Sequence, residues 1–323
     1  MELNLPILHL LEHSRNILIA GAGGGFDVFA GLPIYFTLRD MGKVVHLANY
    51  SFTPLHIVAE YCKTKTLHKH MLEGATAEIP DSLQFGYYPE GYLAQWFKRE
   101  RNEDVTIWMF DRTGPKTLKQ LYQKLIDHLE IDTLILIDGG IDSLMRGDEA
   151  GAGTLLEDTI TLSAVESLDI PIKILGCLGF GSELEVCHYN ALDNMQRMVK
   201  EEAFYGACAL VKQMPVYQQY EQACRYVWER PSHKKSHINM RVVSATNGEF
   251  GDHHIYDDYV PQPVFVTSLM SLYWFYDAQT VVKNSFLAKV IHDEVTIEDA
   301  YKKTMELRIA FQNDAREYHP LPY

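Results

Sequence analysis

Short apolar runs alternate with amphipathic stretches along the first two thirds of the chain. The runs at residues 17–20, 44–48, 105–110, 134–137 and 172–175 have the length and composition of buried strands. Stretches with helical spacing lie between or after them, at residues 32–40, 53–61, 91–99, 116–128, 154–167 and 184–202. This alternation predicts an α/β fold, with a doubly wound, mostly parallel, Rossmann-like sheet that is covered on both faces.

The pattern changes at about Phe204, where the chain becomes more helical and more aromatic. We predict helices at residues 213–228, 266–277 and 297–311, and a strand at 240–244. Residues 1–203 are therefore expected to form the Rossmann-like core with the ligand-binding loops. Residues 204–323 are expected to form a mainly helical extension or cap, either separate from that domain or part of it.

A glycine cluster follows the first predicted strand. Glycine allows a sharp turn and lets a ligand approach the main chain, so a ligand pocket is expected here. The spacing departs from the dinucleotide fingerprint, because Phe26 takes the third glycine position and Asn49 stands where a ribose-binding acid is expected. This makes an NAD(P)-dependent oxidoreductase a minor alternative. The candidate ligand-binding residues are Gly21, Gly23, Gly24, Gly25 and Asp27.

Asp27, at the exit of this loop, bears on the kind of ligand. Its carboxylate would repel a close phosphate and is better suited to hydroxyl groups, a cation or a backbone amide. The structural alternative is that the glycines serve tight packing while Asp27 caps a helix.

A second, acidic loop follows the fourth predicted strand. In a sheet of strand order 3-2-1-4-5 the first and fourth strands are neighbours, so both loops would face one crevice at the switch point. Clustered carboxylates can hold Mg²⁺, act as a general base or bind ribose hydroxyls, and arginine can bind a phosphate. Asp138 and Asp142 are the candidate metal ligands, and Gly139, Gly140, Ser143 and Arg146 are candidate ligand-binding residues. Alternatively, the two aspartates cap backbone amides and Arg146 pairs with Asp148 or Glu149.

A third loop, after the fifth predicted strand, lies on the same rim. It contributes Gly179 as a ligand-binding candidate and Glu183 as a catalytic candidate beside Asp138 and Asp142. Ser182 and Glu185 have the spacing of a capping box, which favours a structural role for Glu185. Residues 247–258, with adjacent His253 and His254, are a further candidate, although adjacent strand residues point to opposite faces.

Composition narrows the classes of function. The chain has 323 residues, 47% of them hydrophobic, and a formal charge of −14, which argues against a general nucleic-acid surface. No apolar segment approaches the roughly 20 residues that span a bilayer. The five cysteines are odd in number and form no C-x-x-C pair, so we expect reduced thiols in a cytoplasmic protein. We expect no nucleic-acid or membrane partner, and the sequence leaves open whether the chain forms a homo-oligomer.

Two motifs together resemble an uncharacterised prokaryotic family known as domain of unknown function 1152. They are the glycine cluster at residues 21–28 and the acidic loop at 138–149. The resemblance implies a cytoplasmic α/β protein with a nucleotide-type fold, and it supplies no reaction and no catalytic residue. From the two converging loops we expect a small-molecule enzyme that acts on a nucleotide, nucleoside or sugar-like substrate by hydrolysis or group transfer. The alternatives are a non-catalytic nucleotide or metabolite sensor and an NAD(P)-dependent oxidoreductase.

Overall fold

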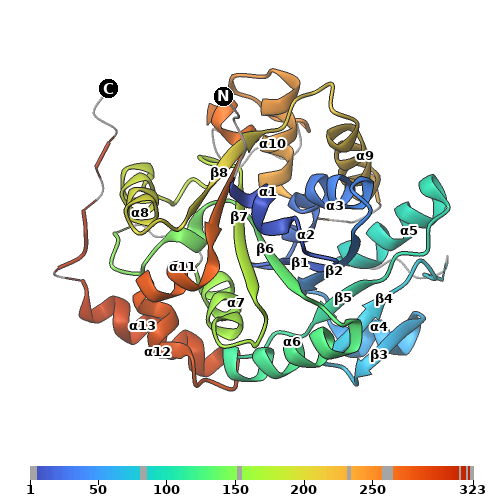
Figure 1. Ribbon diagram of the computed structural model, residues 1–323, viewed down its shortest axis with the longest axis horizontal. Coiled ribbons are helices and arrows are strands. Elements are labelled where there is room, and N and C mark those ends of the chain that lie inside the picture. Colours follow the sequence, from blue (N-terminus) through green and yellow to red (C-terminus); the bar gives the residue numbers. More distant parts are fainter. Residues whose placement is uncertain are drawn as a thin grey trace.

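A nine-stranded sheet, in the order β3-β4-β5-β2-β1-β6-β7-β11-β8, runs through the molecule (Figure 1). It is seen in a computed structural model that describes residues 6–80, 86–150, 155–230, 234–256, 265–312, 314–317 and 319–320. Helices pack on both sides of the sheet, so the predicted α/β, Rossmann-like class is confirmed.

The centre of the sheet is parallel. β1 (Asn16–Gly21) lies between β2 (Val44–Tyr50) and β6 (Thr133–Gly139). β5 (Ile107–Phe110) extends the sheet beyond β2, and β7 (Ile172–Leu178) extends it beyond β6. These five strands are the predicted ones, and their spatial order is the predicted 3-2-1-4-5. The first and fourth predicted strands are therefore neighbours.

Both edges of the sheet are antiparallel, which the apolar pattern did not predict. β4 (Leu72–Ala75) and β3 (Thr64–His68) form one edge. β11 (Leu272–Asp277) and β8 (Phe204–Ala209) form the other, next to β7. A two-stranded sheet of β9 (Gly251–Asp252) and β10 (Phe265–Val266) lies apart from them.

Two predictions in the last third are wrong. The helix predicted at 266–277 is instead the end of β10, the 3₁₀ helix η2 (Ser268–Ser271) and β11. Its aromatic residues suit a strand, since Tyr273 and Phe275 pack into one core and Tyr276 into the other. The strand predicted at 240–244 lies inside α10 (His237–Asn247), where capping by Ser236 and one-sided burial outweigh its β-branched residues.

The two faces of the sheet carry separate hydrophobic cores, because alternate residues of each strand point to opposite faces. Leu18 and Ala20 of β1 enter one core, while Ile17 and Ile19 enter the other. The first core is covered by α6 (Pro115–Leu129), α7 (Leu156–Glu166), α8 (His188–Lys200), α11 (Ala278–Asn284), α12 (Phe286–Ile291) and α13 (Ile297–Ala310). The second is covered by α1 (Pro6–Leu11), α2 (Asp27–Ala30), α3 (Leu32–Asp40), α4 (Leu55–Tyr61), α5 (Pro89–Arg101), α9 (Pro215–Trp228) and α10.

The connections that follow β1 and β6 lead to opposite faces of the sheet, and this reversal determines where the site lies. The chain leaves β1 toward α2 on one face and leaves β6 toward α7 on the other (Figure 1). The two loops diverge at the carboxyl ends of neighbouring strands, which is where open α/β sheets hold ligands. Among the described residues, no helix has the length and apolar character needed to cross a membrane.

Candidate acidic active site

An open cleft of about 750 Å³ lies at the carboxyl ends of β1, β6 and β7. Its walls come from the three loops singled out in the sequence, together with the start of α7 and the segment that leads into α10. Of the predicted site residues, the cleft is lined by Gly23, Gly24, Gly25, Asp27, Asp138, Gly139, Asp142 and Glu183. The predicted convergence of the glycine loop and the acidic loop is thus present in the structure.

Asp27 joins the glycine loop to the acidic loop. Its carboxylate accepts hydrogen bonds from the backbone N–H of Gly23 at 2.6 Å and from that of Gly139 at 3.3 Å. The loop can turn back toward Asp27 because Gly24 and Gly25 have φ angles of +88° and +59°. The Gly23 amide therefore serves a carboxylate of the protein, which speaks against the phosphate binding of a dinucleotide fingerprint.

Asn49, near the end of β2, holds the glycine loop in place by hydrogen bonds. Its side-chain amide donates to the carbonyl oxygen of Gly25 at 2.9 Å and to a carboxylate oxygen of Glu90 at 2.8 Å. Gly21 packs directly against the Asn49 side chain and does not line the cleft, so its role is close packing. Asn49, which replaces the ribose-binding acid of the dinucleotide fingerprint, thus orients the glycine loop.

Asp138 lies at the end of β6, at the centre of the acidic cluster. The backbone N–H of Ser143 donates to its Oδ2 at 3.2 Å, and the Ser143 hydroxyl donates to the same oxygen. Burial raises the pKa of Asp138 to about 6, although the hydrogen bonds from Ser143 favour the ionised form. Ser143 lies behind this carboxylate, so it orients Asp138 and does not line the cleft.

Glu183 reaches the cluster from the loop after β7. Its Oε2 accepts a hydrogen bond from the backbone N–H of Ile141 at 2.7 Å. The carboxylate lies against Gly140, where a Cβ would collide with it, so Gly140 makes room for Glu183. Gly179, with a φ of +110°, packs against Ser182 and Ile238. Both glycines shape the wall without lining the cleft.

Asp142 begins the short 3₁₀ helix η1 (Asp142–Leu144) beside Glu183. The side chain is 6% exposed and faces the cleft. Burial raises its pKa well above the usual range, and the nearby carboxylates of Asp158 and Glu183 raise it further. Burial likewise raises the pKa of Glu183, and the charge of Asp138 adds to the effect.

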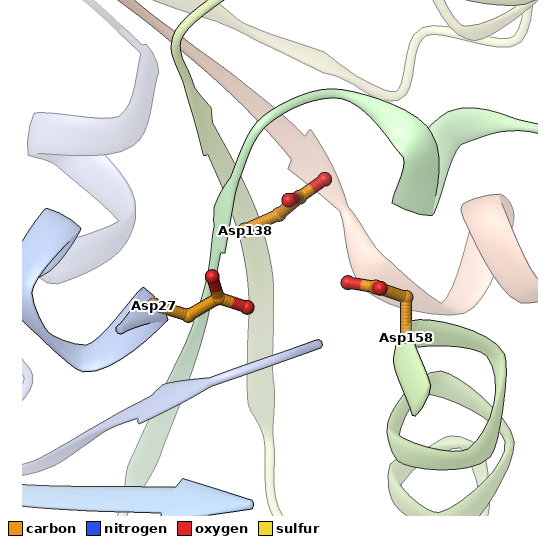
Figure 2. A group of neighbouring side chains, drawn as sticks. All are labelled: Asp27, Asp138 and Asp158. Atoms are coloured by element: carbon orange, nitrogen blue, oxygen red, sulfur yellow. The ribbon is translucent and has the colours of Figure 1, made fainter. Parts of the chain in front are cut away.

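Asp158, in the first turn of α7, is a site residue that the sequence reasoning missed. Figure 2 shows its carboxylate pointing toward those of Asp27 and Asp138. It is 5% exposed, and its Oδ1 has no hydrogen-bond partner among the described residues. Burial, followed by the charges of Asp138 and Asp27, raises its pKa well above the usual range. The topology could have predicted Asp158, because the connection after β6 brings the start of α7 to the same edge of the sheet as the start of α2.

Five carboxylates therefore share one cluster, in which Asp138, Asp142 and Asp158 are buried and Asp27 and Glu183 are half-buried. Oxygens of Asp27, Asp138 and Asp158 lie within 4.8 Å of one another, and so do oxygens of Asp138, Asp142 and Glu183. Burial and the charge of Asp138 raise the pKa of Asp27 as well. Such a cluster is costly in the absence of protons or cations, because like charges repel strongly when water is excluded. Its chemistry is that of cation binding and proton transfer.

The cleft is also lined by cationic side chains. Lys234, Lys235 and Arg241 line it, and Ser236 caps the N-terminus of α10 there by accepting the Asn239 N–H. The Arg241 guanidinium donates to the carbonyl oxygen of Ser182, which holds it near Glu183. The sequence shows the two lysines, but nothing in the linear pattern placed them in the same cleft as the acidic loop.

Two aromatic residues close the cleft beside the glycine loop. Phe52 follows β2 and packs over Gly24 and Gly25, and the Arg112 guanidinium lies 5.4 Å from the centre of its ring. Tyr87 lines the same wall and meets Phe26 edge to face. Aromatic faces in this position can stack on a base or a sugar.

Arg146 lies outside the cleft. Its guanidinium donates to the carbonyl oxygen of Asn284, lies over the ring of Phe286 and is 3.7 Å from Asp148. The alternative in which Arg146 pairs with Asp148 describes its position better than ligand binding does.

The predicted capping box of Ser182 and Glu185 is absent, and the predicted histidine site lies apart from the cleft. α8 begins at His188 with Cys187 at its N-cap, so Ser182 and Glu185 form no capping box, and Glu185 instead lines the cleft. His253 bonds to the Ser244 hydroxyl at 3.1 Å beside α10, and with His254 it lines a separate, smaller pocket. Residues 257 and 258 of that candidate segment lie outside the described residues.

Fold and site together define an α/β, Rossmann-like protein with a carboxylate-rich cleft at its switch point. The chain matches the model of a protein family of unknown function, DUF1152, over residues 89–316, and it belongs to that family. The match includes the acidic loop, Asp158 and Glu183, while the glycine cluster precedes it. No curated protein and no solved structure is significantly similar to this chain.

Proposed function

We propose that this protein is an enzyme that hydrolyses, or transfers a group from, a nucleotide, nucleoside or sugar-like substrate. The observation that carries the proposal is the convergence of five carboxylates, three of them buried and two half-buried, in one open cleft. Buried, mutually repelling acids destabilise a fold, so their concentration in a cleft points to catalysis. The free thiols of the chain support the cytoplasm as the proposed location.

The remaining walls of the cleft support the substrate class. Lys234, Lys235 and the N-terminus of α10 favour an anionic group such as a phosphate. Phe52 and Tyr87 offer faces for a base or sugar ring. A ligand of this class would therefore place its ring against Phe52 and Tyr87 and its anionic group near Lys234 and Lys235.

The acids take different parts in the proposed reaction. Asp138, oriented by Ser143, and Asp142 hold a water molecule or a Mg²⁺ ion in the floor of the cleft. Glu183, beside Asp142, either accepts a proton from the attacking water or hydroxyl group or joins Asp138 and Asp142 in holding the Mg²⁺ ion. Asp27 holds the two loops together and faces the substrate hydroxyls.

The test combines ligand identification with turnover. Native protein is analysed by mass spectrometry for co-purifying small molecules, and purified protein is incubated with nucleotides, nucleosides and phosphosugars in the presence of Mg²⁺. We expect product from one of these classes and a loss of at least 100-fold in kcat/KM on Asp138→Asn. Asp148→Asn, on the same loop but facing Arg316, is the matched control and retains turnover.

Two results contradict the proposal. Tight binding of a ligand by the wild type without any product would favour a sensor. Equal turnover by wild type and Asp138→Asn would place the reaction elsewhere in the molecule.

A further inference from the structure

We propose that the cleft binds two divalent cations, with Asp138 as the carboxylate that bridges them. One cation is held by Asp27, Asp138 and Asp158, and the other by Asp138, Asp142 and Glu183. The inference deepens the proposed function, and it rests on that function only for the statement that the cations face a substrate.

The first cation position lies between the glycine loop and α7. The oxygens of its three aspartates lie within 4.8 Å of one another, a spacing that an oxygen-ligated ion can span. The backbone fixes Asp27 through Gly23 and Gly139, so one ligand is already in place. Gly23 leaves room for the third, because a Cβ there would lie 2.5 Å from Asp158 Oδ2.

Asp158 supplies the independent sign of a ligand. A buried carboxylate oxygen is normally hydrogen-bonded, yet its Oδ1 has no such partner within the part of the chain that the structure describes. The side chain points toward Asp27 and Asp138 (Figure 2). A cation between the three carboxylates would satisfy this oxygen.

The second position lies between the acidic loop and the loop after β7. Oxygens of Asp138, Asp142 and Glu183 also lie within 4.8 Å of one another. The N–H of Ile141 fixes Glu183, and Ser143 fixes Asp138, so the backbone again orients two of the three ligands. Asp138 belongs to both groups, which is the arrangement of a bridging carboxylate in two-metal sites.

Charge balance favours two ions over one. A single divalent cation leaves three of the five carboxylate charges uncompensated, whereas two cations leave one, beside Arg241. The ligands are all hard oxygen donors, so Mg²⁺ or Mn²⁺ fits them better than softer ions. Such a pair would also attract the phosphate of a substrate held by Lys234 and Lys235.

The experiment uses Mn²⁺ alone as the probe, with full-length protein freed of metal by EDTA. Calorimetric titration is expected to give two Mn²⁺ ions per chain. Two-metal sites hold their ions about 3.5–4 Å apart, so electron paramagnetic resonance should show a spin-coupled pair in place of the isolated-ion spectrum. Asp158→Asn and Glu183→Gln should each reduce the stoichiometry to one and remove the coupling. Asp138→Asn should also remove the coupling, while Asp148→Asn should retain both ions.

A wild-type protein that binds one Mn²⁺ or none would overturn the inference, as would a coupled pair that survives in Asp158→Asn. Circular dichroism melts establish that each variant is folded, and the wild-type spectrum decides the question without any variant. Turnover with fewer than two bound ions would defeat the two-cation centre and leave the proposed function standing. Two bound ions without turnover of any substrate class would support the two-cation centre and contradict the proposed function.

Discussion

At the scale of single residues, the site depends on acids that the surrounding chain orients and dehydrates. Ser143 aligns Asp138, Ile141 aligns Glu183, and Gly23 and Gly139 align Asp27. The Oδ1 of Asp158 has no hydrogen-bond partner among the described residues, and burial and the neighbouring carboxylates raise the pKa of this acid. Each of these acids costs stability in the absence of a cation, because the folded state disfavours its ionised form.

The metal-free protein should therefore lose stability as the pH rises. The folded pKa of Asp158 lies above its unfolded value, so the folded state binds the proton more tightly. The stability from this proton is present at low pH and is lost as the pH rises through the folded pKa. The charges of Asp138, Asp27, Glu183 and Glu157 act on this group, and the raised folded pKa values of Asp27, Asp138, Asp142 and Glu183 add to the slope.

Urea unfolding in EDTA at pH 5 and pH 8 measures this effect. The wild type should lose stability between the two values, and Asp158→Asn should lose less, because it lacks the carboxyl group whose folded pKa is raised. The exposed Asp104→Asn is the control and should follow the wild type. A variant that loses as much stability as the wild type would show that Asp158 carries no such shift.

At the scale of elements, the glycine loop is a support for Asp27. Two residues with positive φ turn the chain from β1 into α2, and Asn49 holds the loop from below. The loop amides bond to the protein, so the loop differs in function from a phosphate-binding loop despite a similar composition. The start of α7 presents Asp158 to the same place from the other face.

Gly24→Ala should be more destabilising than the same change at Gly42. Both glycines have positive φ, +88° and +79°, so both substitutions carry backbone strain of about 1 kcal/mol. At Gly24 the new Cβ would also collide with the carbonyl oxygen of Tyr50 and the Phe52 ring, whereas at Gly42 it meets no atom within 4 Å. We expect an additional loss of at least ~1 kcal/mol at Gly24 by urea unfolding. Equal losses would refute the close packing described here.

At the scale of the whole molecule, the end of the chain returns to the acidic loop. Arg316 pairs with Asp148 at 3.0 Å and with Asp193 at 2.8 Å, and it also contacts the fully buried side chain of Glu149. A parallel bridge joins the backbones of Glu149 and Arg316. The far side of the acidic loop is thus clamped by residues remote in sequence, while its near side forms the floor of the cleft.

Arg316→Met should lower the free energy of unfolding by about 2–4 kcal/mol. The substitution leaves the buried Glu149 without its cationic partner, and an unpaired buried charge is costly. Lys302→Met, at an exposed position of α13, is the control and should change stability by less than ~0.5 kcal/mol. Urea unfolding measures both. A change at Arg316 no larger than the control would mean that the clamp contributes nothing to stability.

The sequence by itself determined the parallel core and the meeting of two loops. Five apolar runs between amphipathic helices leave few arrangements other than a doubly wound sheet, and the switch point then follows from the strand order. Asp27, Asp138, Asp142 and Glu183 were found because each stands at a strand end or just beyond it. The aromatic run of β11 was read as a helix, since strand pairing with β7 and β8 is non-local and leaves no periodic signal of its own.

Only the tertiary structure decided how the site is completed. Asp158, Lys234 and Arg241 lie on helices or loops remote from the two motifs, and folding alone brings them to the cleft. Arg146, which the motif placed beside the aspartates, turns away to Asn284 and Phe286. Local sequence fixes which strand ends carry charge, whereas the packing of helices on both faces fixes which charges meet. The sequence pattern therefore predicts part of the cleft lining, and contacts between distant elements complete it.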